Sequence, residues 1–394
     1  MKKIGMITYR DIADGKGRFL QAFSLYSAIQ HLGYDVELID YYPKNKSIIK
    51  ESKQNKIMRI LKNPNDWPGY LAKLQHDTML YIYRDQFNTK RTMYDSFIND
   101  NIVVTQKKYY GYESLLNGNL NYDAYVCGSD QIWNPNFQGL DPAYYLRFAP
   151  ESKRIAYAPS LGTTEINEMQ KKIMKENLDG MNYVSVREKS GAEIIAGITG
   201  KDVKNVLDPT LLLPLEWWED FAGEEKPEKP YVLTFLFDNN KHPRRIAKEI
   251  ANKYGYDIIS IPDSFADLFF RGNKEISVGP EKFVNLFKNA SFVCTQSFHG
   301  VILSLIYNRQ FLVFNRDTKG PRTSIFSRIS DLLEMVRLES RIIRDGEALP
   351  TNIEIIDFTK ANLVLEEKRQ ESLAYLRNAL FEAVGGKEDE NSSN

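Results

Sequence analysis

One set of residues able to bind a sugar follows the apolar run at the start of YDAYVCGSDQIWNPNF, which begins at Tyr122. Ligands of α/β sheets bind at the carboxyl ends of strands, and a glycine such as Gly128 lets a ligand approach the backbone. We predict that Trp133 stacks on a sugar ring and that Asp130 and Asn134 bind its hydroxyl groups. The alternative is an ordinary turn, capped by Asp130, that binds no ligand.

A second set could bind an anion and move a proton, and it lies in SFVCTQSFHGVILSLIYN, which begins at Ser291. We predict a buried strand up to Thr295, a loop that holds Ser297 and His299, and an apolar helix after Gly300. A helix start offers free N–H groups and a partial positive charge, which suit a phosphate or carboxylate. Because the pKa of histidine lies near neutrality, His299 is predicted to be a general acid or base. A structural role is the alternative, and we assign it to the other histidines, His31, His76 and His242.

Basic residues after other predicted strands could complete the anion site. Arg187 follows the strand 183–186, where a guanidinium could hold an anion through two parallel hydrogen bonds. Pairing with Glu188 is the alternative. The chain after Phe314 is also basic, although solvation explains many such residues. The predicted anion-binding residues are Arg187, Ser297, Gly300, Arg316, Lys319 and Arg328, with Arg322 close by.

Hydrophobic periodicity predicts two successive parallel α/β units that position these residues. In the first we expect strands at 4–8, 36–40, 123–126, 155–158 and 183–186, with helices at 19–32 and 166–178 and a mostly helical stretch at 44–105. In the second we expect strands at 231–237, 257–261, 292–295 and 311–314, with helices at 244–254, 281–289 and 301–307. Two such Rossmann-like domains form a cleft between their strand ends.

The amino-acid composition argues against some classes of binding partner and some cellular compartments. The 394 residues carry 52 basic and 52 acidic side chains, so the overall field favours neither nucleic acid nor an acidic membrane. Cys127 and Cys294 each end an apolar run, which is typical of reduced, buried thiols, and we see no cluster of metal-binding residues. No signal peptide or membrane span is expected, which favours a cytoplasmic protein. Basic residues between Lys44 and Lys62 predict a solvated face, with contact to the inner face of the membrane or to an acidic polymer as the alternative.

Motifs spread along the chain resemble those of the polysaccharide pyruvyltransferase family. They are the loop with Gly17 and the LQAFSLYSAIQHLG after it, then YDAYVCGSDQIWN, SVREKSG, VLDPTLLL and SFHG. The resemblance implies two facing Rossmann-like domains, similar in architecture to GT-B glycosyltransferases. It also implies transfer of the enolpyruvyl skeleton of phosphoenolpyruvate onto two hydroxyls of a hexose in a polysaccharide or its precursor. Phosphate is released, and neither a cofactor nor a metal is implied.

The resemblance also implies residue roles. Arg187 matches a donor-binding arginine, His299 matches a proposed acid that protonates the methylene carbon, and Asp130 is our candidate base toward the sugar. The predicted acceptor-binding residues are Gly17, Gln21, Ser129, Gln131, Trp133 and Asn134. Ser297 stands where some members have arginine, so either another basic residue supplies the missing charge or the donor is different. Gly15 stands where many members have asparagine, in the loop implied to take part in acceptor recognition.

The expected domains follow from the linker-like composition between Pro209 and Pro230. We expect an acceptor-side Rossmann-like domain at 1–222, a donor-side one at 223–350, a helix at 351–384 that packs back on the first domain, and a disordered tail at 385–394. The apolar positions of that helix need a partner surface; they are Leu363, Leu365, Leu373, Leu376, Leu380 and Phe381. Two alternative functions are a GT-B glycosyltransferase that uses a nucleotide sugar and a non-catalytic carbohydrate-binding protein.

Overall fold

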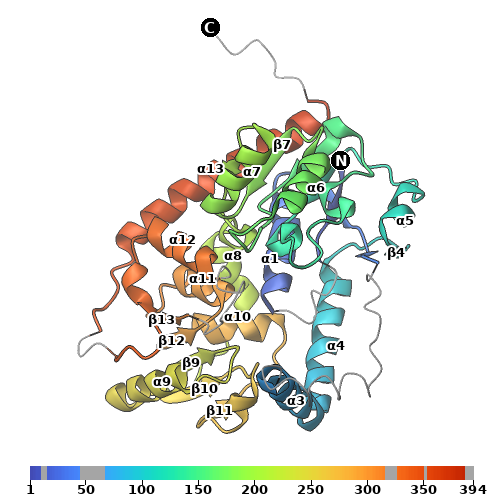
Figure 1. Ribbon diagram of the computed structural model, residues 1–394. Coiled ribbons are helices and arrows are strands. Elements are labelled where there is room, and N and C mark those ends of the chain that lie inside the picture. Colours follow the sequence, from blue (N-terminus) through green and yellow to red (C-terminus); the bar gives the residue numbers. More distant parts are fainter. Residues whose placement is uncertain (10–15, 45–66, 316–325, 350–352, 387–394) are drawn as a thin grey trace.

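The chain forms two parallel α/β domains that lie one above the other in Figure 1. The computed structural model describes residues 1–9, 16–44, 67–315, 326–349 and 353–386. Each domain contains a six-stranded sheet, and every strand pair in both sheets is parallel. The predicted fold of two Rossmann-like domains is therefore confirmed.

The first sheet has the strand order β2-β1-β5-β6-β7-β8. The strand bounds are Lys3–Ile7 for β1, Asp35–Leu38 for β2, Ala124–Cys127 for β5, Arg154–Ala156 for β6, Tyr183–Val186 for β7 and Lys204–Asn205 for β8. The helices of this domain include α1 (Lys16–His31), α5 (Tyr112–Leu116), α6 (Glu168–Leu178) and α7 (Lys189–Thr199). A small separate sheet pairs β3 (Tyr41–Tyr42) with β4 (Tyr109–Tyr110). All four residues of β5 are buried, because helices cover both faces of a parallel sheet.

The second sheet has the strand order β11-β10-β9-β12-β13-β14, the order of a Rossmann fold. The strand bounds are Tyr231–Phe235 for β9, Asp257–Ser260 for β10, Asn273–Lys274 for β11, Phe292–Thr295 for β12, Phe311–Phe314 for β13 and Ile342–Ile343 for β14. The covering helices are α9 (Lys241–Tyr254), α10 (Pro280–Lys288), α11 (Phe298–Ile306) and α12 (Ser327–Met335). The strand order reverses direction between β9 and β12, and ligands of such sheets bind at this point. In the first sheet the same reversal lies between β1 and β5.

Helices also tie the two domains together. α8 (Leu215–Ala222) packs on α10, although the predicted boundary at residue 222 placed it in the first domain. α3 (Trp67–Ile82) and α4 (Arg84–Asn101) reach from the first domain to the second (Figure 1), where Asn239 donates a hydrogen bond to Gln75. None of the described helices has the length and the apolar run needed to cross a membrane. Most of the basic stretch between Lys44 and Lys62 lies outside the described residues, as does the tail beyond 386.

The last helix, α13 (Thr359–Ala383), runs along the first domain, as the sequence predicted (Figure 1). Its Tyr375 hydroxyl donates to the Ala156 carbonyl of β6, and its Ser372 hydroxyl accepts from the Leu207 amide. The buried apolar positions include Leu365, Leu376 and Leu380, and Leu373 is partly buried. The prediction is wrong for Leu363 and Phe381, which are 69% and 39% exposed because they lie on the outer side of the helix.

Candidate functional site

Arg187 and His299 come from opposite domains and meet at one carboxylate, that of Asp208. Arg187 follows β7, Asp208 follows β8, and His299 lies in the first turn of α11. Arg187 Nη1 donates to Asp208 Oδ2 at 2.5 Å, and His299 Nε2 lies 3.8 Å from the same oxygen. All three residues are buried. The structure thus brings together Arg187 and His299, the predicted donor-binding residue and the predicted acid, on either side of Asp208.

Arg187 and Asp208 stabilise each other's charge, whereas His299 is held toward its neutral form. Burial alone would raise the pKa of Asp208, but Arg187 and His299 outweigh burial and keep that pKa below its usual value. Burial would lower the pKa of Arg187, but Asp208 and Glu188 raise it overall, so the guanidinium stays charged. For His299, burial is the largest effect and Arg187 adds to it; together they outweigh Asp208 and lower the pKa. His299 in the free protein is therefore mostly neutral at neutral pH.

Two buried nitrogen atoms of the cluster have no hydrogen-bond partner among the described residues. They are Arg187 Nη2 and His299 Nε2. Buried polar atoms in folded proteins nearly always have a partner, so such atoms at a domain interface indicate groups that pair with a ligand. Arg187 Nη2 lies 3.6 Å from Asp130 Oδ1, beyond hydrogen-bond distance.

Arg328, one of the predicted anion-binding residues, joins the same cluster from α12. Its guanidinium lies 5.6 Å from the centre of the Phe298 ring, and that of Arg187 lies 4.6 Å from it. Asp130 Oδ1 is 4.0 Å from Arg328 Nη1, and Asp130 Oδ2 is 3.8 Å from Arg18 Nε. An aromatic face attracts guanidinium groups, so Phe298 can hold two like charges close together. Arg316 and Lys319, also predicted to bind the donor, lie outside the described residues.

The start of α11 differs from the prediction, because the helix begins at Phe298 and includes His299. Ser297 caps the helix, and its Oγ accepts the Gly300 amide at 3.2 Å. The anion seat predicted at Ser297 and Gly300 is thus already filled by a side chain of the protein, which corrects that prediction. Gly17 has a clear role instead: a Cβ there would lie 2.3 Å from His299 Nδ1, so only glycine lets α1 approach the histidine this closely.

The predicted acceptor loop after β5 is largely a structural element. Trp133 has no exposed surface, stacks on Tyr145 with ring centres 4.9 Å apart, and donates from Nε1 to the Tyr144 carbonyl. The prediction that Trp133 stacks on a sugar is therefore wrong. Gln21 and Ser129 were also predicted to bind the acceptor, but both are buried and the Ser129 amide donates to Gln21 Oε1.

The other two predicted acceptor residues of this loop bind each other. Asn134 donates from Nδ2 to Gln131 Oε1 at 2.7 Å, and the Asn134 side chain is buried. A Cβ at Gly162 would lie 2.3 Å from the same Gln131 oxygen, so the loop packs closely against the chain that follows β6. The amide groups of Gln131 and Asn134 are therefore engaged within the protein.

The burial of Trp133 predicts that Trp133→Ala loses stability rather than affinity for a sugar. Truncating a fully buried tryptophan leaves a cavity and costs about 3–5 kcal/mol. We expect the free energy of unfolding in urea to fall by this amount, and Trp133→Phe to lose clearly less. An unchanged unfolding midpoint together with weaker sugar binding would restore the sugar-stacking role.

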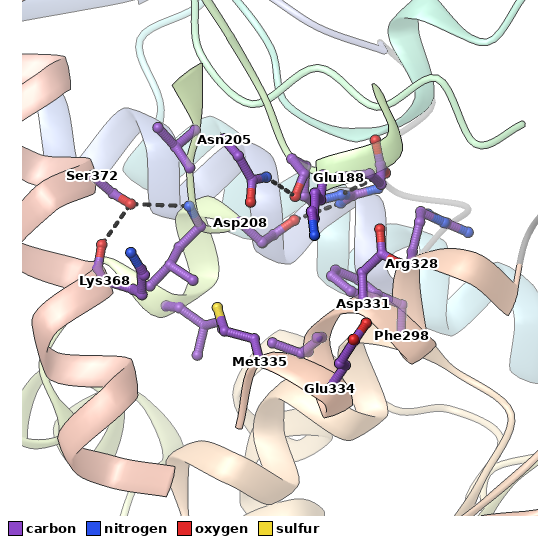
Figure 2. A pocket seen from close by; sticks show the side chains of 16 residues that line it. Glu188, Asn205, Asp208, Phe298, Arg328, Asp331, Glu334, Met335, Lys368 and Ser372 are labelled. Atoms are coloured by element: carbon purple, nitrogen blue, oxygen red, sulfur yellow. Dashed lines mark hydrogen bonds and ion pairs between the residues drawn. The ribbon is translucent and has the colours of Figure 1, made fainter. Parts of the chain in front are cut away.

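A cavity of about 310 Å³ adjoins the cluster (Figure 2). It is bordered by the chain after β7, the segment between β8 and α8, the start of α11, and helices α12 and α13. Arg187, Asp208, Phe298 and Arg328 line the side that faces the cluster. Asp208 was not among the predicted site residues, although it belongs to the motif VLDPTLLL. An aspartate directly after a predicted strand end was the signal that could have found it.

Two Rossmann-like domains that share one buried, charged site at their interface define a protein of the GT-B-like architectural class. Within that class, the chain belongs to the polysaccharide pyruvyl transferase family, whose family model matches residues 16–318. This match covers most of the chain and supports a transferase that acts in polysaccharide biosynthesis. The family suggested by the sequence motifs is therefore confirmed.

Other comparisons add little to this assignment. No curated protein matches the chain. Among solved structures, the chain is similar to the S. aureus MnaA-UDP co-structure, with 12% identity, a TM-score of 0.48, and coverage of 98% of this chain and 93% of that one. It is also similar to UDP-N-acetylglucosamine 2-epimerase from Rickettsia bellii, with 11% identity, a TM-score of 0.42, and coverage of 96% of this chain and 98% of that one. The glycosyltransferase SnogD from Streptomyces nogalater has 10% identity and a TM-score of 0.41, with coverage of 98% of this chain and 100% of that one. These scores are too low to say anything about activity.

Proposed function

We propose that the protein transfers the pyruvyl skeleton of phosphoenolpyruvate onto two hydroxyls of a hexose in a polysaccharide or its precursor, forming a ketal. One observation carries the proposal: Arg187 Nη2 and His299 Nε2, from opposite domains, are buried without a hydrogen-bond partner in the described part of the chain. A donor with a carboxylate and a phosphate needs buried cations, because burying such charges unpaired costs several kcal/mol. Arg187 and Arg328 supply these cations, and phosphoenolpyruvate is the only co-substrate required.

In the proposed reaction, protonated His299 gives its proton to the methylene carbon of the donor, and the electrons of the C=C bond form the new C–H bond. A sugar hydroxyl oxygen then bonds to the central carbon, and phosphate leaves with the electron pair of its C–O bond. The second hydroxyl closes the ring on the same carbon. The two hydroxyl protons balance the proton that enters the new methyl group and the one that phosphate takes up.

We assign Asp130 to positioning the cations, and not to the base role expected from the sequence. Its carboxylate lies 3.6 Å from Arg187 Nη2 and 4.0 Å from Arg328 Nη1, so it orients both guanidinium groups toward one point. Because Arg187 Nη2 and His299 Nε2 are enclosed here, we expect the domains to separate to admit the donor and to close on it.

The test is phosphate release from phosphoenolpyruvate in the presence of gluco-, galacto- and manno-configured nitrophenyl hexosides. We expect release that depends on one of the hexosides, together with a product that carries the pyruvyl group. Nucleotide-activated sugars should not replace phosphoenolpyruvate. Glycoside formation from such a sugar, with phosphoenolpyruvate left intact, would support the glycosyltransferase alternative instead.

The lowered pKa of His299 predicts a characteristic pH dependence. His299 must be protonated to act as the acid. The pH dependence of kcat/KM reports its pKa in the free enzyme, and that of kcat reports its pKa in the complex with substrate. Because burial lowers the pKa of His299 in the free protein, kcat/KM should fall with rising pH through a value below the usual 6.5. The bound donor is an anion and raises that pKa, so the fall in kcat should come at higher pH. Identical profiles for kcat and kcat/KM would argue against His299 as the acid.

A further inference from the structure

Four acidic side chains line the cavity beside the cluster, namely Glu188, Asp208, Asp331 and Glu334. Two of them, Glu188 and Asp331, come from opposite domains and are not used in the proposed donor site. Glu188 follows Arg187 at the end of β7, and Asp331 lies on α12. Figure 2 shows Asp331 rising from α12 toward the side of the cavity where Glu188 lies. Neither was predicted as a site residue, since Glu188 was regarded only as an alternative partner of Arg187.

Each of these two carboxylates accepts hydrogen bonds but also has one oxygen atom that accepts none from the described residues. Glu188 is buried, and its Oε1 accepts from Ser160 Oγ and from Arg187 Nε at 3.4 Å. Asp331 is half-buried and accepts a hydrogen bond from the backbone of Ser190. Glu188 Oε2 and Asp331 Oδ2 are buried and have no hydrogen-bond partner within the described ranges. Leaving two such acceptors unpaired is costly, so their place at a cavity indicates a ligand with hydrogen-bond donors.

The rest of the cavity suits a monosaccharide. Its volume of about 310 Å³ is near the lower end of the usual range for small-molecule sites, roughly 300–1,000 Å³. Part of the wall is apolar and is formed by Leu211, Leu332 and Met335. Lys368 of α13 adds a hydrogen-bond donor. The lining thus combines apolar side chains with many charged and polar groups, and such groups can fix the orientation of a small ligand.

The negative charges of Glu188 and Asp331 disfavour binding of the anionic donor at their end of the cavity. Phosphoenolpyruvate is an anion, and like charges at close range repel each other. Burial raises the pKa of Asp331, and the neighbouring Glu188 raises it further, which means that the two carboxylates already repel each other in this position. A neutral ligand with hydroxyl groups relieves this cost, whereas the anionic donor belongs at the Arg187 end.

We infer that this cavity is the acceptor subsite of the proposed transferase, in which Glu188 and Asp331 each bind one of the two hexose hydroxyls that form the ketal. The inference rests on the proposed function. Each carboxylate takes up the proton of its hydroxyl as that oxygen bonds to the central carbon of the donor. The protons then pass to solvent, where one returns to His299 and the other reaches the released phosphate. The acceptor thus lies in the cavity bordered by α12 and α13, and Trp133 is not among the residues that line it.

The test compares Glu188→Gln and Asp331→Asn with wild type, using the panel of nitrophenyl hexosides with and without phosphoenolpyruvate. Binding of the hexosides is measured by calorimetry without donor, and turnover by phosphate release. We expect both variants to bind phosphoenolpyruvate like wild type, to bind hexosides at least tenfold more weakly, and to lose at least tenfold in turnover. Glu193→Gln on the exposed face of α7 is the matched control and should behave like wild type.

Different outcomes separate this inference from the proposed function. If wild type releases phosphate but both variants keep wild-type hexoside affinity and turnover, the acceptor subsite is elsewhere and the proposed function stands. If wild type binds a hexoside through Glu188 and Asp331 but never consumes phosphoenolpyruvate, the subsite stands and the proposed function fails. Failure of wild type to bind any hexoside would overturn the subsite. Thermal unfolding checks that Glu188→Gln still folds, and Asp331→Asn gives an independent test because its side chain is only half-buried.

Discussion

Replacing His299 by glutamine is expected to lower turnover by roughly a hundredfold or more, the usual contribution of a general acid. Glutamine has a similar reach and can donate a hydrogen bond, but it cannot give up a proton to carbon. Donor binding should largely survive, since Arg187 and Arg328 remain. The measurement is phosphate release at saturating substrates, beside calorimetry with phosphoenolpyruvate.

A structural role for His299 would give a different result. His299 packs against Gly17 and beside Asp208, so a packing residue would show its loss in the unfolding midpoint and not in turnover. His242→Gln is the matched control, because His242 lies on α9 and is absent from the cluster. Normal turnover in His299→Gln would remove this residue from the chemistry.

Replacing Arg187 by lysine is expected to weaken phosphoenolpyruvate binding by roughly 10- to 150-fold, which corresponds to losing one charged hydrogen bond of about 1.5–3 kcal/mol. Nη1 of Arg187 already donates to Asp208, and Nη2 is the nitrogen that remains for the donor. A lysine ammonium is a point charge that cannot serve both partners in this planar geometry. Lysine also loses much of the stacking on Phe298.

The matching control is Arg245→Lys, an exposed arginine of α9 that pairs with Glu249. It should leave donor affinity and turnover unchanged. Calorimetry with phosphoenolpyruvate measures the affinity, and chemical unfolding shows whether Asp208 is still paired. If Arg187→Lys binds the donor like wild type but unfolds more easily, Arg187 has only a structural role as the partner of Asp208.

Much of the fold could be predicted from the sequence because both sheets are parallel. Buried parallel strands give continuous apolar runs, and the predictions at 183–186, 292–295 and 311–314 match β7, β12 and β13. The start of α11 was placed late because Ser297 caps the helix while Phe298 and His299 already belong to its first turn. Short strands such as β8 and β14 have only two residues each, too few for any periodic pattern to show.

The site could be predicted in part, and the limits have a physical cause. Strand ends in both sheets identified Arg187, Asp130 and His299, because topology brings those ends together. The sequence could not show which polar residues form hydrogen bonds with other parts of the protein and not with a ligand, as Gln21 and Ser129 do. Equally, the cavity arises only when α12 and α13 pack near the end of β7, so Asp331 had no local signal.

The central claim is that phosphoenolpyruvate donates its carbon skeleton after protonation of its methylene carbon, and a reaction in deuterated water tests it most directly. Wild-type protein, phosphoenolpyruvate and an accepting hexoside are incubated, and the product is examined by NMR and mass spectrometry. The account predicts a ketal whose methyl group carries at least one deuterium, because the proton on His299 exchanges with solvent before it reaches carbon. A ketal whose methyl group holds no deuterium would contradict the protonation step, and a glycoside made from a nucleotide sugar would contradict the transfer itself.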